Sequence, residues 1–373
     1  MLFKDIPGLA AIKQQLVNAV NDDHVAHAQL FVGAEGSANM ALALAYATFL
    51  NCENRLDEDA CGECAACVKS LKYIHPDLHF VFPTAATPKI KREDAVSDKF
   101  LVEWRSFLLQ SPYGNVTDWS FHFGWENKQV IIPRMESRNI VQKLSMKTFE
   151  GKFKIMVIWQ PELMNASSAN GILKILEEPT DKTIFLLVSG DANKLLTTIL
   201  SRTQMLKIPS FEGQDIKSFL DVNEELDEAK KASATYLSEG NLRLAISLAE
   251  GNIDEVQASF KDWMRNCYNW NFHAMIKMGE AFQKGGKEYQ KNLLNAGTKV
   301  MRDTLVNQFE PQMVRVAENE MDFVQKFGKV FTHEKIGQLI PKLEEAHYHI
   351  ERNGNPKILF LDLSLNIARI ARA

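Results

Sequence analysis

The sequence predicts a mixed α/β fold with a mostly parallel sheet in its first part, and helices alone in the rest. Mostly apolar segments at 30–32, 154–158 and 183–189 are typical of buried strands, and helical patterns lie between them. Strands that alternate with helices indicate a parallel sheet with helices on both faces. After Pro209 the strand signals end, and the remaining sequence is helical in pattern.

Length and composition indicate a chain of several globular domains. Its 373 residues are 46% hydrophobic and 24% charged, and about 100–200 residues per domain gives two or three domains. With a formal net charge of −4, the chain as a whole does not attract a polyanion such as DNA. Any nucleic-acid contact is therefore expected to be local or made by partners. The longest apolar runs, 41–50 and 184–188, are shorter than the ~18 residues that span a bilayer, and the N-terminus lacks a signal pattern. We therefore expect a cytoplasmic protein.

The stretch QLFVGAEGSANM, which ends at Met40, has the outline of a phosphate-binding loop without its chemistry. A P-loop reads G-x-x-x-x-G-K-[ST] between a strand and a helix, where backbone N–H groups and the lysine hold phosphate and the hydroxyl holds magnesium. Aligned on Gly33, with Gly36 inside the loop, the second glycine, the lysine and the hydroxyl are replaced by Ala38, Asn39 and Met40. We expect a nucleotide-binding fold that binds no nucleotide here, although any glycine turn between a strand and a helix has this outline.

The strand pattern that begins at Lys154 ends without the acids of a Walker-B motif. Such a strand ends in an acid that holds magnesium, often followed by one that activates water. Trp159 and Gln160 stand in those positions, and Glu162 follows where we expect a helix-start or surface acid. Taken with the altered loop, these losses favour an inactive site over misalignment.

Four of the five cysteines have the spacing C-x8-C-x2-C-x2-C: Cys52, Cys61, Cys64 and Cys67. Four thiolates on one short segment suit tetrahedral zinc in a closed structural site, with no open position for catalysis. Two disulfides are the alternative, which a reducing cytoplasm disfavours. The fifth, Cys267, is expected to be a small buried apolar residue.

Several motifs together resemble bacterial clamp-loader subunits of the AAA+ class. They are HAQLFVGAEGSAN, the four-cysteine segment, HPDL at 75–78, KIMVIWQPELMNASSANGILKILEEP and TTILSRTQ, in that order. The resemblance covers most of residues 1–210 and continues weakly to GNPKILFLDLSL at 354–365. Within this family the chain most resembles the delta-prime type of DNA polymerase III subunit, which is related to the gamma and tau subunits.

The resemblance implies a non-catalytic subunit that serves a neighbour's ATP site. Clamp loaders are pentameric arcs with ATP between neighbours, and delta-prime-like subunits commonly lack a working P-loop yet donate an arginine from an S-R-C motif. Here Ser201-Arg202-Thr203 carries that arginine, whose planar, permanent charge suits a γ-phosphate held in trans. The alternative for Arg202 is a structural pair with a nearby acid.

The resemblance also implies three segments and a set of partners. Residues 1–210 would form the AAA+ nucleotide-binding-like domain with the zinc module at 52–67, residues 211–252 a small helical lid, and residues 253–373 a helical collar for oligomerisation. Arg243 resembles the sensor arginine of such lids and is expected to be a relic or a surface cation. The implied partners are gamma/tau and delta subunits, the sliding clamp and primed DNA, with no ATP in this chain's own site and no membrane.

About forty residues, 85–128, depart from the family pattern. They contain the basic cluster KIKRED, an apolar run around Trp104, and the aromatic residues Tyr113, Trp119, Phe121, Phe123 and Trp125. Basic residues beside aromatic rings can bind single-stranded nucleic acid, but acids follow this cluster. We expect an insertion that packs on the core or against a partner, with nucleic-acid binding as the alternative.

Two other functions remain open from the sequence. An active gamma/tau-like ATPase would need the missing lysine and would hydrolyse ATP when purified. A zinc-dependent nucleic-acid-binding module would bind DNA with strong salt dependence and would lose that binding with its zinc.

Overall fold

The computed structural model describes residues 1–125, 128–250, 253–311, 318–352 and 354–372. The chain divides into two compact units, the first of residues 1–222 with 240–244 and the second of residues 223–239 with 245–373. Within the described ranges, no helix has both the length and the apolar character needed to cross a bilayer.

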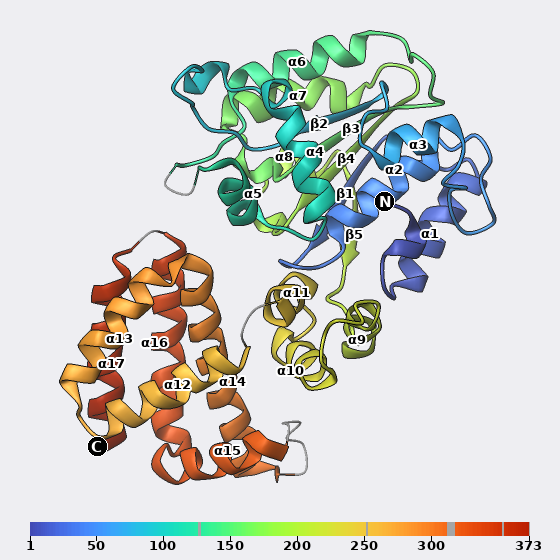
Figure 1. Ribbon diagram of the computed structural model, residues 1–373. Coiled ribbons are helices and arrows are strands. Elements are labelled where there is room, and N and C mark those ends of the chain that lie inside the picture. The colour runs from blue at the N-terminus through green and yellow to red at the C-terminus, as the bar shows by residue number, and fades with distance from the viewer. Residues whose placement is uncertain (126–127, 251–252, 312–317, 353, 373) are drawn as a thin grey trace. The chain divides into compact units, whose positions relative to one another are not determined.

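The first unit is built on a five-stranded parallel sheet with the strand order β2-β3-β4-β1-β5 (Figure 1). Its strands are β1 (Ala28–Gly33), β2 (Leu78–Val81), β3 (Lys154–Trp159), β4 (Thr183–Ser189) and β5 (Gln204–Ile208). Every residue of β3 and β4 is buried, as expected for central strands covered on both faces. The parallel sheet predicted from the sequence is confirmed. The edge strand β2 was not predicted, because four residues are too few for a clear periodic signal.

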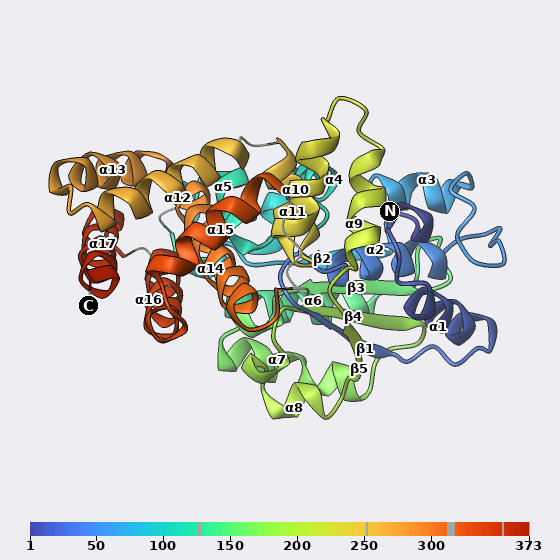
Figure 2. The ribbon, with the colours of Figure 1, turned by 90° about the horizontal axis from the view of Figure 1, so that it is seen from below.

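Helices cover both faces of this sheet. The first face carries α2 (Asn39–Leu50), which packs on β1, β3 and β4, with α1 (Ala10–Asn21) and α3 (Ala65–Leu71) next to it. Every α2 residue from 40 to 50 is buried, which explains why this helix is apolar all round. The opposite face carries α6 (Arg134–Ser145), α7 (Ala166–Glu177) and α8 (Thr197–Leu200), and Figure 2 shows α7 and α8 across the sheet from α2.

A bridge between two residues brackets the insertion in the first unit. Thr84 and Ile131 form an antiparallel bridge in which each N–H donates to the other's carbonyl at 2.9 Å. Between them lie α4 (Leu101–Gln110) and α5 (Val116–Phe123), while residues 126 and 127 of the expected insertion are outside the described residues. The bridge thus brings together the residues that precede and follow the insertion.

Buried aromatic rings hold the insertion on the sheet domain. Trp104 is fully buried, stacks on Phe82 with ring centroids 4.2 Å apart, and lies 5.0 Å from Trp159 at the end of β3. The Trp119 ring, also fully buried, meets Trp104 edge to face at 5.2 Å. Most of the aromatic side chains that raised the possibility of base stacking are therefore core residues, and Phe121 is the exposed exception among them.

The second unit consists of helices, and those after residue 253 share an apolar core. Its helices are α10 (Glu228–Ser238), the end of α11 (Leu242–Glu250), α12 (Ile253–Tyr268), α13 (Phe272–Lys284), α14 (Gly286–Phe309), α15 (Glu318–Val330), α16 (His333–Glu351) and α17 (Pro356–Arg372), while α9 (Gly213–Asp221) belongs to the first unit. Cys267 is fully buried in this core, as expected. The expected boundary between lid and collar at residue 252 lies outside the described residues.

We predict that Trp104→Ala destabilises the first unit by about 3–5 kcal/mol, because a large cavity replaces a fully buried ring. Denaturant unfolding followed by fluorescence measures this loss. Phe121→Ala is the matched control from the same insertion, since Phe121 is 72% exposed and loss of its ring should cost less than about 0.5 kcal/mol. Equal losses in the two variants would contradict the buried role of Trp104.

Candidate functional site

The strands β1, β3 and β4 end at the same edge of the sheet, and the loop that resembles a P-loop lies there. Residues 34–38, which we call the β1–α2 loop, connect β1 to α2. In open parallel α/β sheets, ligands bind outside the carboxyl ends of the strands. Any nucleotide bound by this fold would therefore lie at this edge.

Asn39, which stands in the lysine position, is bonded to the sheet. Its Nδ2 donates to the carbonyl of Gly33 at 3.2 Å and to the carbonyl of Ser189 at 3.1 Å, so it joins the ends of β1 and β4. Its Oδ1 accepts the N–H of Met40 at 2.8 Å, and the Met40 side chain is buried. Asn39 thus makes hydrogen bonds within the chain, and Met40 packs in its core.

The end of β3 is apolar where a Walker-B strand carries its acids. The Trp159 ring is buried and lies 6.0 Å from Phe107 of the insertion. Gln160 follows with a left-handed φ of 56°, which turns the chain sharply out of the strand. Trp159 is thus part of the aromatic core that joins the insertion to the sheet.

Glu162 is a carboxylate at this edge, and it is bonded to the end of β4. It lies in a short 3-10 turn, Pro161–Leu163, as expected of a helix-start acid. Its Oε1 accepts the hydroxyl of Ser189 at 3.0 Å and the N–H of Gly190 at 3.2 Å. Burial raises the pKa of Glu162, so this group is less acidic than a surface acid.

Arg202 lies between α8 and β5 and is paired within the chain. Its Nη2 and Nε lie 3.0 and 3.1 Å from the same oxygen of Glu177, and its Nη1 donates to the carbonyl of Thr198 and to the Ser201 hydroxyl. Its side chain is 29% exposed and that of Glu177 is 59% exposed. Ion pairs this exposed contribute about 0–1 kcal/mol, so the guanidinium separates from Glu177 at little cost.

Arg243, expected as a relic or a surface cation, is largely buried and paired. Its side chain is 11% exposed and is bound by Asp118 of the insertion and by Glu35 of the β1–α2 loop. Neither carboxylate was predicted from the sequence as a partner of Arg243. A signal for Asp118 existed, since Asn115 and Asp118 have the spacing of a helix N-cap and its third residue.

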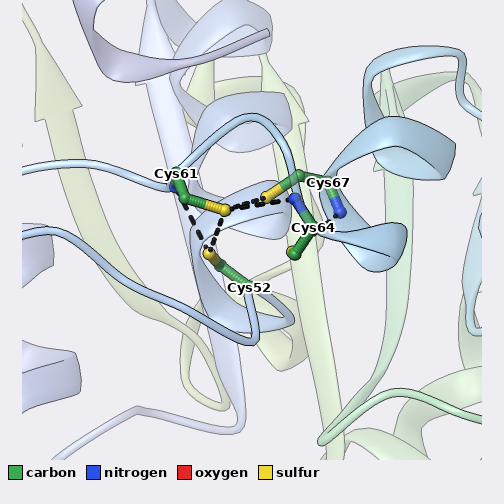
Figure 3. A group of neighbouring side chains, drawn as sticks. All are labelled: Cys52, Cys61, Cys64 and Cys67. Atoms are coloured by element: carbon green, nitrogen blue, oxygen red, sulfur yellow. Dashed lines mark hydrogen bonds between the residues drawn. The ribbon is translucent and has the colours of Figure 1, made fainter.

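The four clustered cysteines come together at one point between α2 and α3 (Figure 3). Their Sγ atoms all lie within 4.8 Å of one another, with Cys61 3.6 Å from Cys52 and 3.8 Å from Cys67. Tetrahedral zinc with Zn–S bonds of about 2.3 Å would hold its sulfurs about 3.8 Å apart, whereas a disulfide needs about 2.05 Å. The cluster is compatible with a structural zinc site and does not form disulfides.

Backbone N–H groups point at these sulfurs. Cys61 Sγ accepts from the N–H of Cys64 at 3.3 Å and from that of Glu63 at 3.5 Å, and these donors lower the pKa of the Cys61 thiol to about 6. Cys64 Sγ accepts from the N–H of Cys67 at 3.4 Å and so caps the start of α3. Burial raises the pKa of Cys52. At Cys61 the donors outweigh burial and favour the thiolate, which is the form that binds metal.

The HPDL motif fixes the loop at residues 149–151. Asp77 accepts the N–H groups of Phe149, Glu150 and Gly151 at 2.6, 2.9 and 2.7 Å. Burial alone would raise the pKa of Asp77, but these donors outweigh it and lower the pKa. Glu150 in turn pairs with Lys69 of α3 at 2.6 Å, which joins the cysteine module to this loop.

The strand order and the loop after β1 define a parallel α/β protein with its site at the carboxyl edge of the sheet. A family model described as "DNA polymerase III, delta subunit" matches residues 8–212, more than half of the chain. The chain belongs to this family.

Curated relatives carry DNA polymerase III names. The delta' subunit of Pseudomonas aeruginosa is 32% identical over 177 residues, 48% of this chain and 41% of that protein. The delta' subunit of Bacillus subtilis is 25% identical over 209 residues, 56% of this chain and 50% of that protein. The tau subunit of Bacillus subtilis is 24% identical over 251 residues, 67% of this chain and 36% of that protein. The chain thus spans half or less of the length of these relatives.

We predict that the purified chain holds one zinc ion, and that Cys61→Ala reduces the metal content to near zero and lowers the thermal midpoint. Losing one of four thiolates opens the site and exposes a small module with little core of its own. Elemental analysis and thermal unfolding measure the two effects. The matched control is Cys267→Ala, which removes a cysteine outside the cluster and should keep the zinc. Retention of stoichiometric zinc by Cys61→Ala would refute the assignment.

Proposed function

We propose that this chain is a non-catalytic, delta-prime-type subunit of a DNA polymerase III clamp loader. Family membership supports the class of complex, and the observation that carries the finer proposal is Asn39. Where ATP chemistry needs a lysine, this side chain is hydrogen-bonded to the carbonyls of Gly33 and Ser189. Nothing with a positive charge or a hydroxyl replaces the missing groups at positions 38–40.

Arg202 is the residue that we assign to a neighbour's ATP site. As an arginine finger it would leave Glu177 and place its planar guanidinium against the γ-phosphate held by the adjacent subunit, with Ser201 beside it. The exposed pair with Glu177 supports this role, since the cost of breaking it is small. Arg202 has three acceptors within the chain, the Glu177 carboxylate, the Thr198 carbonyl and the Ser201 hydroxyl, and none of them lies in β5.

The proposal includes the partners and the cofactor expected from the sequence. Gamma/tau and delta subunits would form the complex, which would load the sliding clamp on primed DNA in the cytoplasm. The cysteine cluster would hold structural zinc, and the helical segments 211–252 and 253–373 would act as lid and collar. The donor set of four sulfurs with separations near those of tetrahedral zinc supports the metal.

An active gamma/tau-like ATPase is the second candidate, because the match to the Bacillus subtilis tau subunit extends over 67% of this chain. The two candidates differ in ATP binding. We predict that the purified chain binds no ATP with magnesium in calorimetry, because the loop lacks the lysine and the hydroxyl that hold phosphate and metal. A paralogue with an intact G-x-x-x-x-G-K-[ST] motif is the positive control. Tight binding followed by hydrolysis would favour the ATPase.

We predict that Arg202→Ala lowers ATP turnover at the site it serves by about 10³-fold in the reconstituted complex, because the γ-phosphate charge loses its partner in trans. Single-turnover hydrolysis with clamp and primed DNA measures this rate. Size-exclusion chromatography should show assembly unchanged.

Two variants serve as controls for the arginine. Arg202→Lys keeps the charge but loses the planar fork and should recover only part of the rate. Glu177→Gln removes the partner within the chain and should leave turnover intact. Arg202 would have only a structural role if Arg202→Ala left ATP turnover unchanged, or if Glu177→Gln lowered turnover as much as Arg202→Ala does.

A further inference from the structure

Residues from three distant stretches of the first unit meet beside the β1–α2 loop. Glu35 belongs to the loop, Asn115 and Asp118 to the start of α5 in the insertion, and Arg243 to the first turn of α11. Asn115 Nδ2 donates to Glu35 Oε1 at 2.6 Å, and Arg243 Nη1 lies 3.3 Å from the same oxygen. The insertion therefore reaches the loop through direct polar contacts.

Asp118 binds Arg243 with both of its carboxylate oxygens. Arg243 Nη2 donates to Oδ1 at 2.6 Å, while Nε donates to Oδ2. The Arg243 side chain is 11% exposed and that of Asp118 is 25% exposed, so solvent screens this pair less than a surface pair. Bidentate geometry is the strong form of this interaction, and the same guanidinium fork fits a phosphate.

The helix cap of α5 fixes the Asp118 carboxylate from a second direction. The N–H of Asn115 donates to Asp118 Oδ2 at 2.8 Å, and the N–H of Asp118 donates to Asn115 Oδ1 at 2.9 Å. This capping box sets the orientation of the carboxylate through contacts within α5. Arg243 thus meets an acceptor that is already oriented.

A backbone contact joins the loop to α11 at the same place. The carbonyl of Gly36 accepts the N–H of Leu242 at 3.1 Å. Gly36 has a left-handed φ of 73°, and a Cβ atom there would lie 1.7 Å from Oδ1 of Asn241. Glycine is therefore required for this close approach, which brings Arg243 next to Glu35.

We propose that Asp118 is an internal anion that takes the place of a phosphate beside the β1–α2 loop. Its carboxylate holds the Arg243 fork and, with Glu35, ties the loop to the first turn of α11 without any nucleotide. The guanidinium fork of Arg243 binds a carboxylate and a phosphate with the same bidentate geometry. Two carboxylates at this place also repel a polyphosphate. The insertion thereby gains a role that goes beyond the proposed function and is independent of Arg202.

Hydrogen–deuterium exchange of the full chain tests this role, with Asp118→Ala as the variant and inorganic pyrophosphate as the probe. Peptides that cover 33–40 and 241–244 should exchange about tenfold faster in Asp118→Ala, because the tie between loop and helix opens more often. Millimolar pyrophosphate should restore slow exchange in this variant and leave the unsubstituted chain unchanged. Rescue by an added anion is a result that a packing role alone would not produce.

The controls make each outcome decisive. Asp98→Ala removes another carboxylate of the insertion, one paired with Lys143, and should leave both peptides unchanged. Asp118→Asn keeps the size of the side chain and should also accelerate exchange and respond to pyrophosphate. The proposal fails if neither Asp118 variant exchanges faster, if pyrophosphate rescues neither, or if it slows exchange in the unsubstituted chain. None of these failures affects turnover by Arg202 in the assembled complex, so the two hypotheses are tested separately.

Discussion

Parallel strands end together at one edge of a sheet, and the polar groups exposed there need hydrogen-bond partners. In this chain its own side chains provide them. Asn39 bonds the carbonyls at the ends of β1 and β4, and Glu162 bonds the hydroxyl of Ser189. These bonds tie the first residue of α2 to the ends of β1 and β4, and the turn after β3 to the end of β4. The edge that binds a ligand in other α/β proteins is here bonded within the chain.

Aromatic rings of the insertion pack at the end of β3, at the same edge of the sheet. Trp159 is buried against Trp104 and Phe107, so a carboxylate at position 159 would be placed among rings without a partner, at a cost of several kcal/mol. The aromatic rings of the insertion therefore favour an apolar residue at position 159. The replacement of the Walker-B acid by Trp159 and the presence of the insertion are thus linked by direct packing.

The two arginines singled out from the sequence have opposite environments. Arg202 is 29% exposed and its partner Glu177 is mostly in solvent, which leaves the guanidinium available at little cost. Arg243 is 11% exposed and is held by Asp118 in bidentate geometry. Burial and partner geometry thus make Arg202 available and hold Arg243 in place. Neither property can be read from single residues in a sequence.

The sequence by itself determined the parallel sheet and the grouping of Cys52, Cys61, Cys64 and Cys67, because apolar runs and short cysteine spacings are local signals. The tertiary structure decided the rest. It added β2, turned Trp104 and Trp119 into the core, and paired Arg243 with Asp118, 125 positions earlier. Such contacts join residues far apart in the chain, where no periodic pattern records them, and they form only when folding brings both partners to the same edge of the sheet.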